Sequence, residues 1–191
     1  MPLEGREIAA LSGAMLRLDV GDLASLRRMD VHGPGAAAFW RLAAKCGFIA
    51  KVGQTEVWMR LVRIMAILVP RGEPEQRGPL HQPKTADGIW RGLGALLCDG
   101  GHAGAVIQRP FVSEARLMRF LAEPAAKRAE TLERFARMLA PKRDRQTGLN
   151  CNDIAALLLA TDPTPVLRRI ARDYYQRLDA ISRQSTKEEA S

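Results

Sequence analysis

The chain of 191 residues is 47% hydrophobic, which is enough to build one medium or two small folded domains and excludes a disordered polar chain. Its net charge is +8, and 23 of its 29 basic residues are arginine. The planar guanidinium fork suits phosphate, so this charge favours a polyanionic partner, although a GC-rich genome would also raise the arginine and alanine content.

Helical periodicity dominates the chain. Apolar residues recur every three or four positions, and runs of β-branched residues are scarce, which predicts helices rather than strands. The predicted helices cover nine segments: 5–17, 22–30, 36–46, 55–69, 88–98, 113–122, 127–140, 153–160 and 165–183. Asp87, Ser113 and Asn152 are predicted N-caps, because short polar side chains accept hydrogen bonds from the first helical turn.

The stretch LDVGDLASLRR, residues 18–28, begins with signals for a helix start. Leu23 and Leu26 then lie three apart on one face. Consecutive helical residues point about 100° apart, so Arg27 and Arg28 cover the side opposite the leucines. This pair either faces an anion or forms the solvated face of the helix.

Three segments break the helical pattern. Residues 70–85 hold four prolines and are predicted to form a mobile loop. The glycine-rich segment 98–104 is a predicted hinge between two helical bundles, residues 1–100 and 105–185, and the polar tail 186–191 is expected to fray. The predicted fold is therefore all-α, with two small bundles packed end to end.

The arginines differ in whether a carboxylate lies three or four residues away on the same helix. Such a neighbour explains an arginine locally, as part of a solvated salt-bridged face. Four are explained in this way: Arg60, Arg91, Arg134 and Arg137. Five lack such a carboxylate: Arg28, Arg63, Arg116, Arg168 and Arg172. Carboxylates from elsewhere in the fold remain possible partners for these five.

Like charges also recur at helical spacing. The pairs are Arg41 with Lys45, Arg60 with Arg63, and Arg168 with Arg172. Each pair costs its own helix a little free energy, so keeping several of them favours an external anion. The segment PKRDR, residues 141–145, is predicted to be an exposed basic loop, and it contributes Lys142, Arg143 and Arg145 to this charge, with one opposing acid.

The three cysteines lie far apart and form no CxxC pair: Cys46, Cys98 and Cys151. This spacing argues against a disulfide framework and a structural zinc site, and it favours a reducing cytoplasm. The first residues carry charges where a signal peptide would be apolar, and the longest apolar run, 64–69, is too short to span a bilayer. A cytoplasmic protein without membrane contact is expected.

No catalytic or cofactor motif is present in the sequence. The three histidines fall near glycine or proline in predicted loops, and neither a phosphate loop nor a nucleophile elbow occurs. The glycines of RGLG, residues 91–94, follow a helical pattern and are a weak nucleotide signal. We therefore expect no enzyme activity, no metal and no cofactor.

Few aromatic residues are available to stack on nucleic-acid bases. Tyr174 shares the apolar face of the last predicted helix and is expected in the core, whereas Tyr175 is free to stack. Trp40 and Trp58 are predicted to be packed, and the pattern around Trp90 favours neither role.

Five motifs in order along the chain share one resemblance. They are LDVGDLASLRR (18–28) with AFWRL (38–42), WMRLVRIMAIL (58–68), LGALLCDGG (93–101), SEARLMRFLA (113–122) and PVLRRIARDYY (165–175). Together they resemble the CasB-type small subunit of the type I-E CRISPR Cascade complex, an antiviral defence assembly. The loop 70–85 and the segment 102–112 depart from shorter members of that family.

The resemblance implies an all-helical, non-catalytic protein with two bundles. Two copies would lie beside the other Cascade subunits that carry the guide RNA, and would help to hold the target and displaced DNA strands of the R-loop. Carried over by position, the basic positions of the family's motifs are Arg27, Arg28, Arg60, Arg116, Arg168 and Arg169. A second set of candidate nucleic-acid contacts adds Arg41, Lys45, Arg63, Arg119, Lys142, Arg143 and Arg172.

Two other classes of function remain as alternatives. A helical adaptor would use the same basic face to dock an acidic protein partner without binding nucleic acid. A helix-turn-helix repressor would need base-reading residues such as Asn and Gln on one helix, and the predicted helices offer mainly arginine. The repressor is therefore ranked last.

Overall fold

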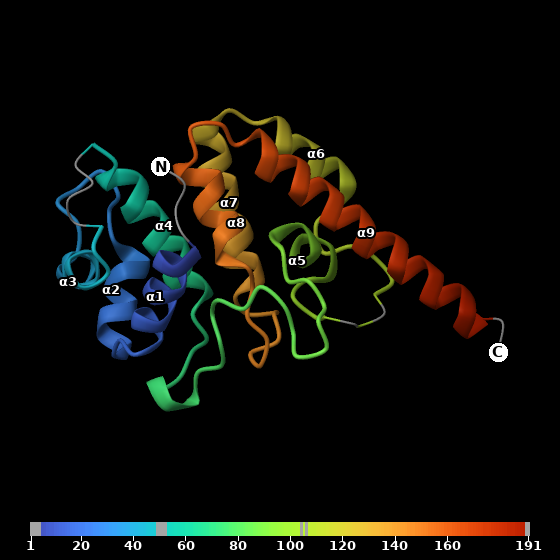
Figure 1. The fold of residues 1–191 in the computed structure, drawn as a ribbon, viewed down its shortest axis with the longest axis horizontal. Helices are drawn as coiled ribbons and strands as arrows, with labels where there is room; N and C mark the ends of the chain where they lie inside the picture. The colour runs from blue at the N-terminus through green and yellow to red at the C-terminus, as the bar shows by residue number, and fades with distance from the viewer. Residues whose placement is uncertain (1–4, 49–52, 104, 106, 190–191) are drawn as a thin grey trace.

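The computed structural model describes residues 5–48, 53–103, 105 and 107–189, and within them the fold is all-α, as predicted (Figure 1). The helices are α1 (Gly5–Leu16), α2 (Val20–Arg28), α3 (Ala37–Lys45), α4 (Thr55–Leu68), α5 (Leu93–Asp99), α6 (Glu114–Ala122), α7 (Ala125–Leu139), α8 (Cys151–Leu159) and α9 (Thr164–Glu189), with a 3₁₀ turn, η1 (Pro74–Gln76). The only β-type pairing in these ranges consists of two isolated bridges, His81 with Leu149 and Lys84 with Trp90.

Most helices begin and end within a few residues of the prediction, and the exception is 88–98. This helix starts only at Leu93, because Gly92 is its N-cap and Lys84 pairs with Trp90 in an antiparallel bridge. Asp87 is therefore not a cap. Ser113 does occupy an N-cap position, and Asn150 takes the place predicted for Asn152. Helix α9 continues to Glu189, so most of the predicted frayed tail is helical.

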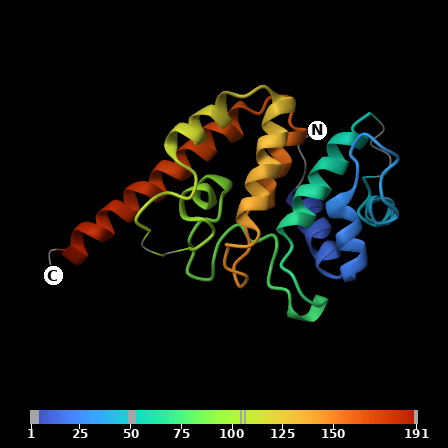
Figure 2. The same ribbon diagram turned by 180° about the vertical axis from the view of Figure 1, so that it is seen from behind.

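Helix α4 is the central element of the molecule (Figures 1 and 2). Its amino-terminal neighbour α2 packs on one side, and α7 and α8 pack on the other. Because it is covered from both directions, its last turns from Ile64 to Leu68 are buried almost all round. Trp58, near its start, stacks on Phe48 with ring centroids 4.3 Å apart.

Helix α5 packs closely against α9, the long helix that crosses the C-terminal half in both views. Gly94 makes this approach possible, because a Cβ atom there would overlap the backbone carbonyl of Ile170. The glycine of RGLG is thus a packing residue and not part of a nucleotide loop. Tyr174 is buried, as expected, and its hydroxyl donates a 2.6 Å hydrogen bond to the carbonyl of Val112.

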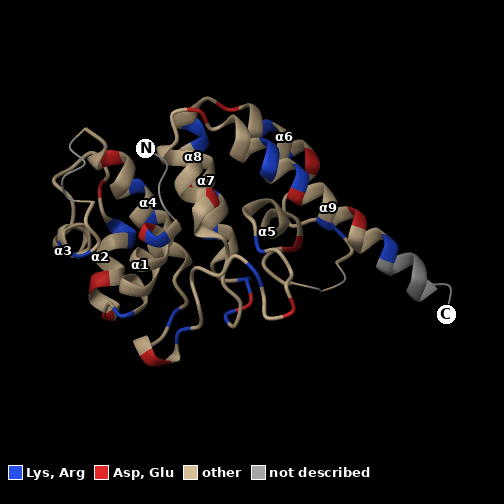
Figure 3. Ribbon diagram, in the orientation of Figure 1, with Lys and Arg blue, Asp and Glu red and all other residues tan. Residues whose placement is uncertain are grey.

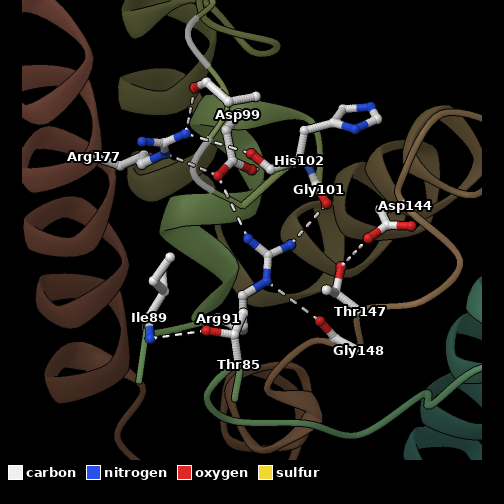
Figure 4. A network of polar contacts seen from close by, with 11 residues as sticks. Thr85, Ile89, Arg91, Asp99, Gly101, His102, Asp144, Thr147, Gly148 and Arg177 are labelled. Carbon is white, nitrogen blue, oxygen red and sulfur yellow. Dashed lines mark hydrogen bonds and ion pairs between the residues drawn. The ribbon is translucent and has the colours of Figure 1, made fainter. Parts of the chain in front are cut away.

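Residues 98–101 of the predicted hinge at 98–104 are buried and bonded to their surroundings (Figure 4). Arg91 is only 1% exposed and contacts Asp99 at 3.5 Å and the carbonyl of Gly101 at 3.0 Å. Arg177 of α9 reaches the same carboxylate at 3.0 Å. One buried carboxylate is thus bound by arginines that precede and follow the predicted hinge, and the hinge itself stays a prediction. The local explanation of Arg91 by Asp87 is replaced by this contact.

The predicted boundary between two bundles does not interrupt the core. A single hydrophobic cluster runs from Ile8 in α1 to Ile181 in α9. The segment 70–85 also contacts both sides, because Arg77 donates to the carbonyls of Leu16 and Leu18 at 2.9 and 2.6 Å, and the amide of Gln82 donates to the carbonyl of Leu149 at 2.9 Å. This loop is therefore tethered to the body of the protein, in contrast to the mobile loop that its composition predicts.

No helix within the described ranges combines the length and the apolar character needed to cross a membrane. Helix α9 reaches 26 residues, but arginine and aspartate recur along its length. A long charged helix of this kind is stable here because its apolar stripe packs on α5 and α8.

Candidate nucleic-acid interface

The thirteen predicted cations divide into three groups according to what their side chains contact in the described residues. Four are bonded to backbone carbonyls or buried carboxylates: Arg27, Arg63, Arg143 and Arg169. Three form ion pairs at the surface: Arg41, Arg60 and Arg172. Six form no ion pair or hydrogen bond with another described residue: Arg28, Lys45, Arg116, Arg119, Lys142 and Arg168.

Arg27 and Arg143 converge on the C-terminal end of α4. Arg27 donates from Nε to the carbonyl of Ala66 at 2.9 Å, and Arg143 donates from Nη2 to that of Leu68 at 2.9 Å. The last carbonyls of a helix have no partner inside it and carry partial negative charge, so guanidinium groups are stabilising there. Burial lowers the pKa of both arginines, and the neighbouring Arg71 adds to the effect on Arg27.

Arg143 is 5% exposed and donates to groups inside the protein, because a second bond of 2.7 Å reaches the carbonyl of Thr147. The prediction that it extends from an exposed basic loop is wrong. Its neighbour Lys142 is exposed as predicted, and its ammonium lies 5.5 Å from the centre of the Phe111 ring. At that distance, the cation and the ring attract each other.

Two of the predicted arginines contact a carboxylate on another helix. Arg63 lacks a local carboxylate in the sequence, and Arg169 is predicted from the resemblance. Arg63 of α4 contacts Glu133 of α7 at 2.8 Å. Arg169 of α9 contacts Asp153 of α8 at 2.7 Å. Burial raises the pKa of Asp153, while its hydrogen bonds from Leu93 N and Arg169 act in the opposite direction. Both arginines thus connect helices.

The surface ion pairs are of unequal quality. Arg41 contacts both carboxylate oxygens of Asp22 at 2.6 Å, and Arg172 contacts its neighbour Asp173 at 2.9 Å. Arg60 reaches Glu56 only at 3.8 Å, as its helical spacing predicted. The pairs of Arg41 and Arg60 involve partly exposed carboxylates and contribute little free energy, so an incoming phosphate competes there at small cost. Asp173 is only 3% exposed, so releasing Arg172 would leave a buried carboxylate with less compensation.

Five of the six cations without an ion pair or hydrogen bond, all except Lys142, lie in two places on the helices (Figures 1 and 3). Arg28 and Lys45 are at the C-terminal ends of the adjacent helices α2 and α3. Arg116 and Arg119 lie on α6, which packs beside α9, where Arg168 is found. All five side chains are exposed. We call these places the α2–α3 cations and the α6–α9 cations.

The exposed aromatic residues differ from the prediction at one position. Trp58 is buried as expected, but Trp40 is 39% exposed and donates to the carbonyl of Pro34 at 2.9 Å. Trp90 donates from Nε1 to Asp173 at 2.6 Å. Tyr175 is exposed on α9, and its ring lies edge-on to that of Tyr174.

Three further cations that form a site with two of the thirteen were not among the predicted nucleic-acid contacts. Arg71, Arg137 and Arg145 line a cavity of about 320 Å³ together with Arg27 and Arg143. We call this cavity the arginine pocket. The loop of Arg71 and the loop of Arg145 meet at the end of α4, and no local pattern indicates that meeting. Both loops cover the apolar run 64–69, and this run is the sequence signal that could have indicated where they meet.

The described part of the chain lacks the ligands for a metal site. It contains no group of three His, Cys, Asp or Glu residues placed to hold a metal ion. His32 contacts Glu56 at 3.2 Å, and His81 accepts a 3.1 Å hydrogen bond from the backbone amide of Cys151. Comparison with protein-family models, curated proteins and solved structures finds no match for this chain.

Proposed function

We propose that this protein is a non-catalytic subunit of a type I-E CRISPR Cascade complex that stabilises the R-loop through sequence-independent contacts with nucleic-acid backbones. The observation that carries the proposal is the pair of exposed cation groups, the α2–α3 cations and the α6–α9 cations, none of which meets a carboxylate among the described residues. The resemblance of five ordered motifs to the CasB-type small subunit supplies the identity of the complex.

The chemistry of these side chains suits phosphate and not base recognition. Four of the five are arginines, whose planar forks match phosphate oxygens. Phosphate contacts fix the position of a strand without reading its sequence. R-loop formation exchanges one duplex for another of similar stability, so protein contacts with the backbone can shift the balance. A modest number of such contacts per subunit is therefore sufficient for this role.

The structure ranks the predicted contacts. The five cations without partners can bind phosphate with no loss of an existing interaction. Arg41, Arg60 and Arg172 would first have to leave or share a carboxylate. Arg63 and Arg169 bond to partly or fully buried groups, and their removal would disturb the fold before it disturbed binding.

Binding of unrelated single- and double-stranded DNA across a salt series tests the backbone contacts. One variant removes Arg28 and Lys45, and a second removes Arg116, Arg119 and Arg168, all to alanine. We expect binding that is independent of sequence and weakens with salt, with a slope that falls by about 0.7 for each lost single-strand contact. Arg183→Ala is the control, because it removes a single exposed charge outside both groups, from an ion pair with Asp179, and should leave the slope nearly unchanged.

Failure of DNA binding at low salt, or equal slopes in all variants, would contradict the backbone contacts. Reconstitution with type I-E Cascade subunits then tests the assembly itself, with R-loop lifetime as the readout. We expect the chain to co-purify with the complex and the two variants to shorten the lifetime of the R-loop. A chain that joins the complex while neither variant changes that lifetime would instead act as a protein adaptor.

A further inference from the structure

The arginine pocket is an unusual concentration of positive charge. Its wall contains Arg27, Arg71, Arg137, Arg143 and Arg145, and the remaining lining residues are apolar. No Asp or Glu is among them. The five guanidinium groups come from α2, the segment after α4, α7 and the loop 141–145, so only the tertiary fold assembles the site.

Two of the five arginines are held rigidly. Arg27 uses Nε and Nη2 to reach the carbonyls of Ala66 and Val69, and Arg143 uses Nη1 and Nη2 to reach Thr147 and Leu68. The third nitrogen of each, Nη1 of Arg27 and Nε of Arg143, has no hydrogen-bond acceptor in the described residues. Donors fixed in this way are ready for a ligand at little entropic cost.

The other three arginines are adjustable. Arg71 and Arg145 are exposed, and neither has an ion pair or hydrogen bond with another described residue. Arg137 contacts Glu133 at 2.8 Å, but that carboxylate oxygen also serves Arg63 at 2.8 Å. One carboxylate shared by two guanidinium groups leaves most of the charge around the pocket uncompensated.

Neighbouring negative groups do not balance this charge. Asp144 lies in the same loop and its negative charge acts on Arg143, but it is one carboxylate beside five guanidinium groups. The C-terminal end of α4 contributes about half a negative charge. The five arginines therefore repel one another, which agrees with the lowering of the pKa of Arg27 by Arg71 in addition to burial. An anion in the cavity would relieve the repulsion.

We propose that the arginine pocket binds phosphate groups, one or two at a time. The cavity of about 320 Å³ lies at the small end of the range of ligand sites, which suits a diphosphate unit more than a larger molecule. Guanidinium forks bind phosphate oxygens bidentately, and five of them favour a multiply charged anion over a single carboxylate. The source is either successive phosphates of a nucleic-acid strand or a free polyphosphate. The first source rests on the proposed function, whereas the second does not.

Isothermal titration calorimetry of the full chain with pyrophosphate at low salt tests the pocket. The variant Arg71→Ala/Arg145→Ala removes the two exposed pocket arginines that have no ion pair or hydrogen bond, so it breaks no such interaction within the described fold. We expect it to bind pyrophosphate at least about tenfold more weakly than the wild type. The control Arg109→Ala/Lys127→Ala carries the same change in net charge at exposed positions outside the pocket and outside both cation groups, and it is expected to retain wild-type affinity. Sulfate at matched ionic strength corrects for screening.

Competition with a single-stranded oligonucleotide separates the two sources. If pyrophosphate displaces the strand from the wild type but not from the pocket variant, the pocket holds strand phosphates. If pyrophosphate binds in the pocket without displacing the strand, the ligand is a free polyphosphate, and the nucleic-acid function stands or falls on the exposed cations alone. Equal loss in pocket and control variants, no binding of pyrophosphate, or tighter binding of a glutamate-rich peptide would each overturn the proposal.

Discussion

At the scale of single residues, arginine has two different roles in this chain. Arg143 is buried and bonds to two backbone carbonyls, whereas Arg28 is exposed and has no ion pair or hydrogen bond among the described residues. Both are basic residues near a helix end in the sequence, and only their surroundings separate them. The same side chain therefore stabilises the fold in one place and leaves charge available to a ligand in the other.

Replacing Arg143 by alanine is expected to lower the free energy of unfolding by about 2–4 kcal/mol. The substitution leaves the carbonyls of Leu68 and Thr147 without their donor, and each unsatisfied buried group costs about 1–3 kcal/mol. Urea denaturation measures the change. Arg28→Ala serves as the comparison and should stay within about 0.5 kcal/mol of the wild type. Equal stability of the two variants would contradict the buried role of Arg143.

His81 makes the stability depend on pH. Its Nδ1 accepts a 3.1 Å hydrogen bond from the amide of Cys151, and burial lowers its pKa below the ordinary value of 6.5. The unfolded chain then binds the proton more readily than the folded chain. Stability is therefore complete above pH 6.5 and decreases as the pH falls through the range between the two pKa values.

The variant His81→Asn keeps an acceptor but cannot titrate. We expect the wild type to lose more unfolding free energy than this variant between about pH 7.5 and pH 5.5 in urea denaturation. A loss of the same size in both proteins would show that other groups cause the acid sensitivity.

At the scale of elements, the contact between α5 and α9 depends on the absence of a side chain at one position. Gly94 has no Cβ, and this lets α5 approach the backbone of α9 at Ile170. The close approach buries α5 and brings Arg177 within reach of Asp99. A short helix with no stability of its own is held in this way by a long one.

Gly94→Ala is therefore expected to destabilise the protein by about 3 kcal/mol, near the upper end for overpacked cores. The added Cβ meets backbone, which cannot move aside as a side chain can. Gly13→Ala in α1 is a matched control, because its Cβ would lie 3.8 Å from the nearest atom, Nη1 of Arg17. The control should be stabilised by about 0.5–1 kcal/mol, since alanine has the higher helix propensity. Thermal or urea unfolding of both variants checks the opposite signs.

At the scale of the whole molecule, the core is continuous across the predicted boundary between bundles. Helix α4 contacts α7 and α8, and the hydrophobic cluster reaches from Ile8 to Ile181. Elements joined by so much shared burial generally unfold together. The molecule should therefore behave as one cooperative unit, even if its sequence divides into two halves.

Comparing two probes of unfolding tests this expectation. Trp40 and Trp58 lie in the N-terminal half, whereas Trp90 contacts Asp173 of α9. In a Trp90→Phe variant the fluorescence therefore reports the N-terminal half, while far-UV circular dichroism reports every helix. We expect coincident urea transitions from the two probes. A fluorescence transition that precedes or follows the dichroism change would instead support two independently folding bundles.

The sequence by itself determined the helices, the all-α class and much of the core, because these follow from signals within a few residues of one another. Leu23, Leu26 and Tyr174 are buried where their spacing places them. Only the tertiary structure decided which arginines are free. Glu133 meets Arg63, and Asp99 meets Arg91 and Arg177, because helices distant in sequence pack together. The arginine pocket likewise forms from four segments between residues 27 and 145, whose meeting depends on burial of α4 and has no local signature.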